Sequence, residues 1–237
     1  GLKAVELFDA VKDGKIKALW IMATNPAVSM PNSTHIAEAL ATCPFVVMAD
    51  VAANTETARY AGVLLPAQGW GEEDGSVTNS ERRISRQRQF MEAEGEARAD
   101  WRIMCDVAKQ MGFEGFNFQS SAEIFAEHAA LTGLMNNGRR LLDLKHLAVQ
   151  NYDEMQPQQW GTERPFAHGQ FETPDGKARF VPTKAKLEQD IQSLKFTLNT
   201  GRIRDQWHTM TRTGLVPKLF GHRAEPRAVI VGARQEH

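Results

Sequence analysis

The sequence lacks the cysteine and histidine patterns of several protein classes. Its two cysteines, Cys43 and Cys105, lie far apart and outside any CxxC spacing. This excludes a disulfide scaffold and argues against a metal or iron–sulfur site built from cysteine. The seven histidines contain no HExxH-type pair, so the sequence predicts no metal site. We expect both cysteines to be small buried side chains in a reducing compartment, which favours a cytoplasmic protein.

Charge and hydropathy exclude two further classes of partner. The 28 Lys and Arg residues nearly cancel the 29 Asp and Glu residues, so the bulk charge does not favour nucleic acid or a membrane surface. No apolar run approaches the roughly 20 residues that cross a bilayer. We therefore expect no nucleic-acid partner and no membrane. The 237 residues are enough for one large domain or two small ones.

The first half of the chain alternates predicted helices with predicted strands. Helices are predicted over 2–12, 33–41, 54–60 and 100–111, and strands over 18–22, 45–50 and 63–66. The strands are continuously apolar, which is typical of parallel strands covered by helices on both faces. We predict an α/β fold with a Rossmann-like parallel sheet and flanking helices, although the chain has no GxGxxG motif.

The second half gives weaker signals. We expect a long solvated loop over 70–83, a polar strand-like run over 84–90 and a helix over 122–131. Residues 132–160 are polar and read as an irregular or weakly helical connection. A Pro-Asp-Gly turn between Phe171 and Phe180 predicts a hairpin.

Polar side chains follow two of the predicted strands. Asn25 comes after 18–22, and Asp50 ends 45–50. Open α/β sheets bind ligands beyond the carboxyl ends of their strands, so both residues are candidate ligand contacts. Asn and Asp at these positions also cap the next helix, and the residues alone leave both roles open.

A run rich in hydrogen-bond donors follows the short strand predicted over 196–199. Gly201 breaks this strand and lets backbone amides approach a ligand closely. Arg202, His208 and Thr209 supply donors suited to phosphate or pyrophosphate. An ordinary basic surface turn explains the same composition equally well.

Two ordered sets of motifs carry a resemblance to a known family. The motifs are TGR at 200–202, WHT at 207–209 and TRTG at 211–214, preceded by TET at 55–57, LLP at 64–66, WGE at 70–72 and TNSERR at 78–83. The earlier set resembles the third domain of the molybdopterin-dinucleotide oxidoreductases, over about residues 1–112, and the later set resembles the start of their last domain. The similarity is strongest to the nitrate reductases of that family, with formate dehydrogenases as the nearest rival.

The resemblance implies a cofactor and a set of contacts. The cofactor is molybdopterin guanine dinucleotide carrying molybdenum, and its contacts would fall on Asn25, Ala49, Asp50, Asp100, Thr200, Gly201, Arg202, Trp207, His208 and Thr209. A carboxylate accepts from both N1–H and the 2-amino group of guanine, which gives the aspartates a physical reason to bind it. Glu73 stands where the family often has a lysine, which removes a positive charge.

The resemblance also implies that the chain is part of a larger enzyme that reduces nitrate to nitrite. The metal ligand and an iron–sulfur cluster would lie in a missing N-terminal part, so the chain alone should be inactive. The partners would be nitrate, an electron-donor protein or subunit, and the remaining domains. The implied division is a Rossmann-like domain (1–113), a connection (114–165), a hairpin and linker (166–195) and an incomplete β-barrel (196–237), whose residues 227–237 depart from the family pattern. A stand-alone nucleotide-binding or interaction module is the alternative.

Overall fold

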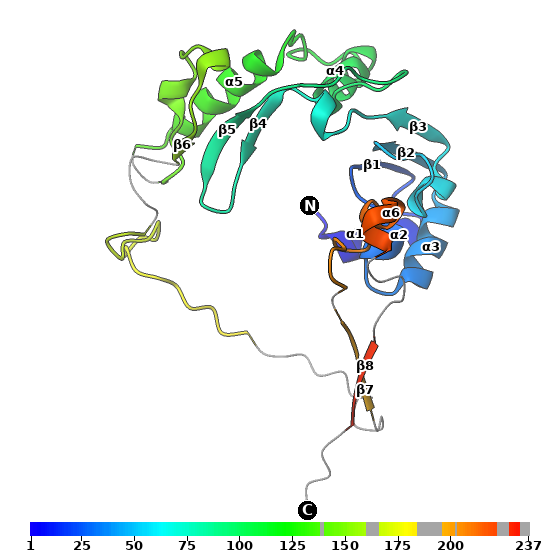
Figure 1. The fold of residues 1–237 in the computed structure, drawn as a ribbon. Coiled ribbons are helices and arrows are strands. Elements are labelled where there is room, and N and C mark those ends of the chain that lie inside the picture. Colours follow the sequence, from blue (N-terminus) through cyan, green and yellow to red (C-terminus); the bar gives the residue numbers. More distant parts are fainter. Residues whose placement is uncertain (138–139, 160–165, 184–195, 202, 222–227, 233–237) are drawn as a thin grey trace, which may run out of the picture.

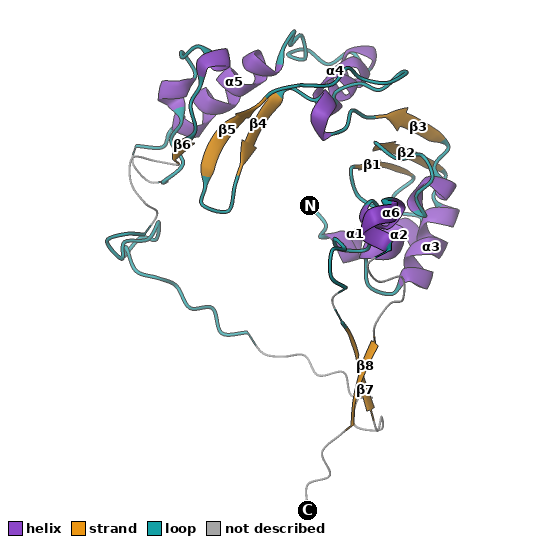
Figure 2. Ribbon diagram, viewed as in Figure 1, coloured by secondary structure: helices purple, strands orange, loops and turns teal. Residues whose placement is uncertain are grey.

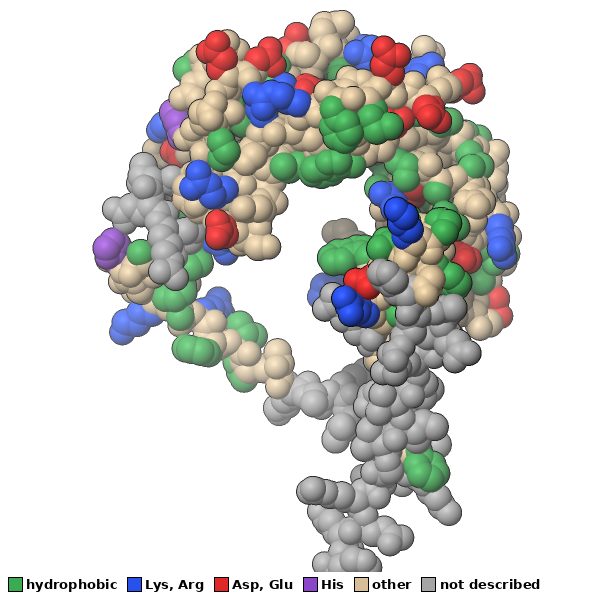
Figure 3. Space-filling model, in the orientation of Figure 1, with side chains coloured by type: hydrophobic (Ala, Val, Ile, Leu, Met, Phe, Trp, Pro, Cys, Tyr) green, Lys and Arg blue, Asp and Glu red, His purple; other side chains and the backbone are tan. Residues whose placement is uncertain are grey.

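The computed structural model describes residues 1–137, 140–159, 166–183, 196–201, 203–221 and 228–232. These residues form an open ring, with a parallel sheet and its helices on one side and an antiparallel sheet with α5 on the other (Figure 1). The space-filling view shows the same ring open at its centre, with hydrophobic side chains gathered along the upper part of its inner rim (Figure 3). Residues 166–183 run as an extended strand-free segment along the lower side of the ring. None of the described helices is long and apolar enough to span a bilayer.

The predicted parallel sheet is present. It contains β1 (Ala18–Met22), β2 (Phe45–Asp50) and β3 (Val63–Pro66), in the order β1-β2-β3. Both pairs are parallel, with Ala18 opposite Phe45 and Asp50 opposite Pro66. Because parallel strands end at the same edge, the carboxyl ends of β1, β2 and β3 meet there.

Helices cover one side of this sheet. They are α1 (Ala4–Lys12), α2 (Pro26–Ser29), α3 (Ser33–Thr42) and the 3-10 helix η1 (Thr57–Tyr60), and Figure 2 shows the three α-helices gathered beside the strands. Phe8, Val11, Ile36, Leu40 and Val46 form the core between them. Asn32 Oδ1 accepts from the backbone N–H of His35 at 3.5 Å and begins α3.

The expectation of a sheet covered on both faces is wrong for its edge strands. In the central strand β2, Val46, Met48 and Ala49 are at most 2% exposed, although Phe45 at its start is 50% exposed. Trp20 of β1 and Leu64 of β3 are 38% and 44% exposed. Edge strands have one neighbour each, so the described helices shield the centre of the sheet better than its margins.

The antiparallel sheet corrects a second expectation. Its strands are β4 (Gly75–Thr78), β5 (Arg83–Gln87) and β6 (Gln158–Gln159). Residues 70–83 are therefore not one solvated loop, because they hold the 3-10 helix η2 (Trp70–Glu72) and all of β4. Pairing with β5, which places Thr78 opposite Ile84, stabilises a polar strand that its own sequence does not signal.

The helix α5 (Ser121–Gly133) packs beside this sheet. Ile84, Phe125, Leu144, Leu147 and Met155 form a second core there. The stretch predicted as an irregular connection includes the 3-10 helices η3 (Lys145–Leu147) and η4 (Tyr152–Glu154). The helix α4 (Asp100–Gln110) forms where the sequence predicts a helix, and it lies between the two sheets (Figure 1).

Arg86 of β5 ties the second core together. Its guanidinium lies 2.7 Å from Asp74 and 3.0 Å from Asp153, with the side chain only 4% exposed. It stacks 3.9 Å from the ring centroid of Tyr152 and donates to the carbonyl oxygens of Gly75 and Tyr152. A charge so placed is paired on every side, as burial requires.

The hairpin predicted over 171–180 is only half present. The turn forms, since the N–H of Phe171 donates to the carbonyl of Gly176 at 3.0 Å, but neither flank is a strand. Phe180 is 91% exposed, so nothing apolar supports a ladder. The turn chemistry is local, whereas a strand needs a packed face.

The last part of the chain holds β7 (Phe196–Thr200) paired antiparallel with β8 (Ala228–Gly232). The 3-10 helix η6 (Thr213–Leu215) and α6 (Pro217–Phe220) lie between them in sequence. The sequence predicts an incomplete barrel in this region. Among the described residues these two strands form no closed barrel.

Candidate functional site

A pocket of about 450 Å³ lies where residues 203–216 rest on the carboxyl edge of the parallel sheet. We call these residues segment 203–216. Five of the residues proposed from sequence line this pocket: Asn25, Asp50, Trp207, His208 and Thr209. The fold thus brings together two strand ends and a segment more than 150 residues further along the chain.

Asn25 fastens segment 203–216 to the sheet. Its Nδ2 donates to Thr211 Oγ1 at 3.1 Å and to Glu56 Oε2 at 2.8 Å. Its Oδ1 accepts from the N–H and the hydroxyl of Thr57, at 3.2 and 2.6 Å. The bond from Asn25 holds the pKa of Glu56 below its ordinary value. Both donors and both acceptor sites of Asn25 are therefore used within the protein.

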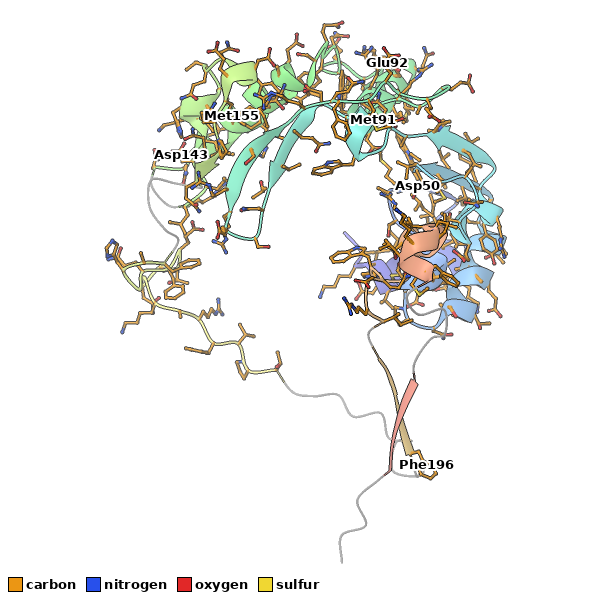
Figure 4. The ribbon with its side chains drawn as sticks, viewed as in Figure 1. Asp50, Met91, Glu92, Asp143, Met155 and Phe196 are labelled. Carbon is orange, nitrogen blue, oxygen red and sulfur yellow. The ribbon has the colours of Figure 1, made fainter. Side chains whose placement is uncertain are left out.

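Asp50 makes the second link. Its side chain is 7% exposed, and its Oδ1 lies 3.6 Å from Arg212 Nη2. The same oxygen accepts from the backbone N–H of Ala52 at 3.1 Å. Figure 4 labels Asp50, which lies between the sheet and the part of the chain next to α6. Asp50 is thus both a turn-stabilising residue and a charge facing the pocket.

Asp50 also lines a second pocket, of about 280 Å³, on the β3 side of the strand end. Its lining includes Ala52, Ala53, Leu65 and Pro66 together with Glu72 and Glu94. This pocket is more apolar than the first. Asp50 lies at the boundary between the two cavities, within reach of a ligand in either.

Asp100 stands close to Asp50 but lines neither pocket. Its Oδ1 is buried without a hydrogen-bond partner. Burial, and then the charge of Asp50, raise the pKa of Asp100, while Arg212 acts in the opposite direction. A buried acceptor without a donor is costly, so this oxygen is suited to a ligand that brings a donor.

Glu73 has a structural explanation. The backbone N–H of Asp100 donates to the Glu73 carboxylate, which therefore caps the start of α4. Burial and the charges of Asp100 and Glu72 raise the pKa of Glu73. The departure from lysine at this position places an acid where a helix N-terminus favours one.

Segment 203–216 is held in shape mainly by its own contacts. Thr213 Oγ1 donates to Gln206 Oε1 at 2.7 Å and accepts from the N–H of Trp207 at 3.0 Å. Asp205, His208 and Met210 all have positive φ, at 65°, 51° and 62°. Such conformations cost energy in residues other than glycine and cluster at ligand sites. Trp207, which lines the pocket, is 75% exposed.

Ala49, Thr200 and Gly201, also proposed from sequence, do not line this pocket. Ala49 is fully buried inside β2, where its carbonyl accepts from the N–H of Ala23. Thr200 ends β7, and Gly201 follows it. Arg202 lies outside the described residues. The structure adds Thr211 and Arg212, which the proposed set omits although they belong to the same donor-rich run.

Comparison with known proteins gives a family for this architecture. Residues 1–110 match the model of the molybdopterin oxidoreductase family. A nitrate reductase of Shewanella frigidimarina is 49% identical over 243 residues, which cover 95% of this chain and 26% of the relative. The first 110 residues match the molybdopterin oxidoreductases.

Two further proteins are similar to this chain. The alpha subunit of an F420-dependent formate dehydrogenase of Methanocaldococcus jannaschii is 34% identical, over 95% of this chain and 33% of the relative. The structure of acetylene hydratase from Pelobacter acetylenicus superposes with a TM-score of 0.54 at 20% identity, over 73% of this chain and 23% of that one. This last likeness concerns the fold alone. The chain spans about a quarter to a third of the length of these relatives.

The described residues at the edge of the sheet offer groups that can bind a ligand. Over the described residues, no group of three or more His, Cys, Asp or Glu side chains is placed to hold a metal ion. The edge of the sheet instead combines an unpartnered carboxylate oxygen, an arginine and several hydroxyls. This set of groups suits a ligand that has both a donor-bearing base and an anionic part.

Proposed function

We propose that this chain is the dinucleotide-holding part of a molybdenum-dependent nitrate reductase. Asp50 and Asp100 bind the guanine base of molybdopterin guanine dinucleotide. Trp207, His208 and Thr209 face its anionic part, and the resemblance adds Ala49, Thr200, Gly201 and Arg202. Asn25 contributes as the residue that holds segment 203–216 against the sheet.

The observation that carries this proposal is the carboxylate of Asp50, which lines both pockets and lies near enough to Asp100 for its charge to raise the pKa of Asp100. Guanine presents two adjacent N–H donors, at N1 and at the 2-amino group. Adenine has no such pair, so two acidic acceptors favour guanine over adenine. The gain comes from satisfying a group that the protein alone leaves without a donor.

The two pockets fit the two halves of such a ligand. The smaller one has apolar walls from Ala52, Ala53 and Pro66, which suit the faces of a flat base. The larger one offers His208, Thr209 and Arg212, which suit phosphate oxygens. Asp50 lines both, as a contact near the junction of base and phosphates would have to do.

When bound, the cofactor supplies the molybdenum at which oxygen is transferred from nitrate. The residues of this chain bind and orient it, and none of them is assigned a catalytic step. We place the metal ligand and an iron–sulfur cluster in other parts of the enzyme, along with the contact to an electron donor. The complete protein is proposed to be cytoplasmic, with the domain division at 113, 165 and 195 that the resemblance implies.

Titration calorimetry tests the guanine assignment on this chain. Guanosine diphosphate should bind more tightly than adenosine diphosphate, and Asp50→Asn should remove most of the difference, because the new amide NH₂ faces a donor. Asp143→Asn, a carboxylate remote from the site, is the matched control and should leave the preference intact. Equal binding of the two nucleotides by the unmodified protein would exclude the assignment.

The substrate needs a test on the full-length enzyme. Identity of 49% to a nitrate reductase against 34% to a formate dehydrogenase subunit favours nitrate. The complete protein should therefore reduce nitrate with an artificial donor and should not oxidise formate. Formate oxidation without nitrate reduction would replace this chemistry with its nearest rival. A gene that encodes only these residues would favour the stand-alone module.

A further inference from the structure

The contact between Arg212 and Asp50 occupies the carboxylate that the proposed guanine site needs. Arg212 Nη2 lies 3.6 Å from Asp50 Oδ1, and the arginine is 58% exposed while the aspartate is 7% exposed. An arginine this open to solvent has room to move. The aspartate, held by the N–H of Ala52 at the end of β2, does not.

Arg212 also lies where it can contact the phosphates of a bound nucleotide. It lines the larger pocket together with His208 and Thr209, whereas Asp50 lines both pockets. A nucleotide whose base contacts Asp50 would bring its phosphates to the cavity where Arg212 already lies. Guanidinium groups bind phosphate in a bidentate manner, at least as well as they bind carboxylate.

We propose that Arg212 is an exchangeable counter-ion, which pairs with Asp50 in the ligand-free protein and moves to the ligand phosphates when guanine takes its place. This deepens the proposed function and rests on it. Asp50 has Arg212 as its partner before binding and the two N–H donors of guanine after it, so the buried carboxylate never faces the pocket without a partner. It also couples binding of the base to binding of the phosphates, because the base displaces Arg212 from Asp50 and Arg212 then binds the phosphates.

Neighbouring contacts allow this movement. Asn25 holds Thr211 independently of Arg212, and Thr213 fixes Gln206 and Trp207. The backbone of segment 203–216 is thus held on both sides of Arg212. The side chain can change partner without release of the segment from the sheet.

The test compares a nucleoside with its diphosphate, using guanosine and guanosine diphosphate as calorimetric probes of the 237-residue chain. For guanosine, Arg212 is only a competitor for Asp50, so Arg212→Ala should bind it about three- to fivefold more tightly. For guanosine diphosphate the same variant loses a phosphate contact and should bind at least about threefold more weakly. Arg212→Lys should show the same two signs with smaller changes, since an ammonium keeps the charge but not the fork.

Arg204→Ala is the matched control. Arg204 is an 88% exposed arginine of the same segment, paired only locally with Asp205 among the described contacts, and its loss should leave both affinities unchanged. Changes of the same sign for both probes in Arg212→Ala would show a plain structural tether and overturn the exchange, as would no change for either.

The two proposals fail in different ways. If the unmodified chain does not prefer guanosine diphosphate to adenosine diphosphate, the guanine site itself is wrong. If that preference holds and the opposite signs are absent, only the exchange is wrong. Absence of binding by both guanosine probes counts against both proposals.

Discussion

Replacing Asp100 with asparagine separates a ligand-binding role from a structural one. Asp100 begins α4, and its Oδ1 is buried without a partner. Burial, and then the charge of Asp50, raise its pKa, so the charged form is less favourable in the folded protein than in the unfolded chain. Asp100→Asn should therefore stabilise the ligand-free protein while it weakens binding of guanosine diphosphate.

The pH dependence follows from the direction of this shift. A carboxyl group with a raised folded pKa contributes its full stability when protonated, below its ordinary value of 3.8. That contribution is lost as the pH rises through the higher folded pKa. Asparagine does not titrate, so the advantage of the variant should be largest at neutral pH and should fade as the pH approaches 4.

The magnitude combines opposing effects. A carboxylate near a helix N-terminus gains roughly 0.3–1 kcal/mol from the helix dipole, which asparagine loses. A buried acceptor without a donor costs about 1–3 kcal/mol, and more when it is charged; asparagine keeps a polar group there, so the variant is relieved only of the additional cost of the charge. We expect a net gain of about 1 kcal/mol at pH 7, which corresponds to a rise in Tm of roughly 2–4 °C in a chain of this size.

Urea unfolding followed by circular dichroism, between pH 4 and pH 8, measures the first effect, and calorimetry with guanosine diphosphate measures the second. The control is Asp106→Asn on the same helix, where the carboxylate is exposed and lies 3.1 Å from Arg98. This change should stay within about 0.5 kcal/mol and leave binding intact. A less stable Asp100→Asn protein at pH 7, or one that binds guanosine diphosphate like the parent, would refute the reasoning.

Three further predictions concern the parts around the site. Asn25→Ala should lower the free energy of unfolding by about 2–4 kcal/mol, because Thr57 and two other groups lose buried partners; urea titration would contradict this with a loss below about 1 kcal/mol. Arg86→Ala should lower the free energy of unfolding by roughly 2–3 kcal/mol in the same assay, because it leaves carboxylates unpaired. The control Arg83→Ala removes one exposed hydrogen bond to a carbonyl and should lower it by less than about 1 kcal/mol. The purified chain should hold neither iron nor molybdenum in stoichiometric amounts, and either metal surviving desalting would show a centre that its two cysteines do not explain.

Much of the parallel sheet could be predicted from local sequence. The apolar run 18–22 is bounded by turn residues, and the structure places β1 on the same residues. The strand β4 could not be predicted in this way, because Gly75 to Thr78 gains its extended form from pairing with β5. The Pro-Asp-Gly turn forms without strands for the converse reason, since its flanks have no face to pack against.

In the candidate site, too, local features could be predicted from the sequence and tertiary contacts could not. Strand ends are readable from apolar runs, so the sequence alone is enough to place Asn25 and Asp50 at one edge of a sheet. The contact between Arg212 and Asp50 depends on the tertiary structure. The spacing of these residues along the chain gives no signal for it. Glu73 shows a similar limit, because its partner, the N–H of Asp100, becomes a neighbour only once α4 has docked.

The bond between Asn25 and Thr211 also sets an order of events during synthesis of the protein. These residues are 186 positions apart, and ribosomes add about 5–20 residues per second, so the strand ends wait roughly 10–40 s for their partner to be made. During that interval segment 203–216 does not yet cover the carboxyl edge of the sheet. If the proposed site binds a nucleotide, we therefore expect binding to require that translation has passed Thr211.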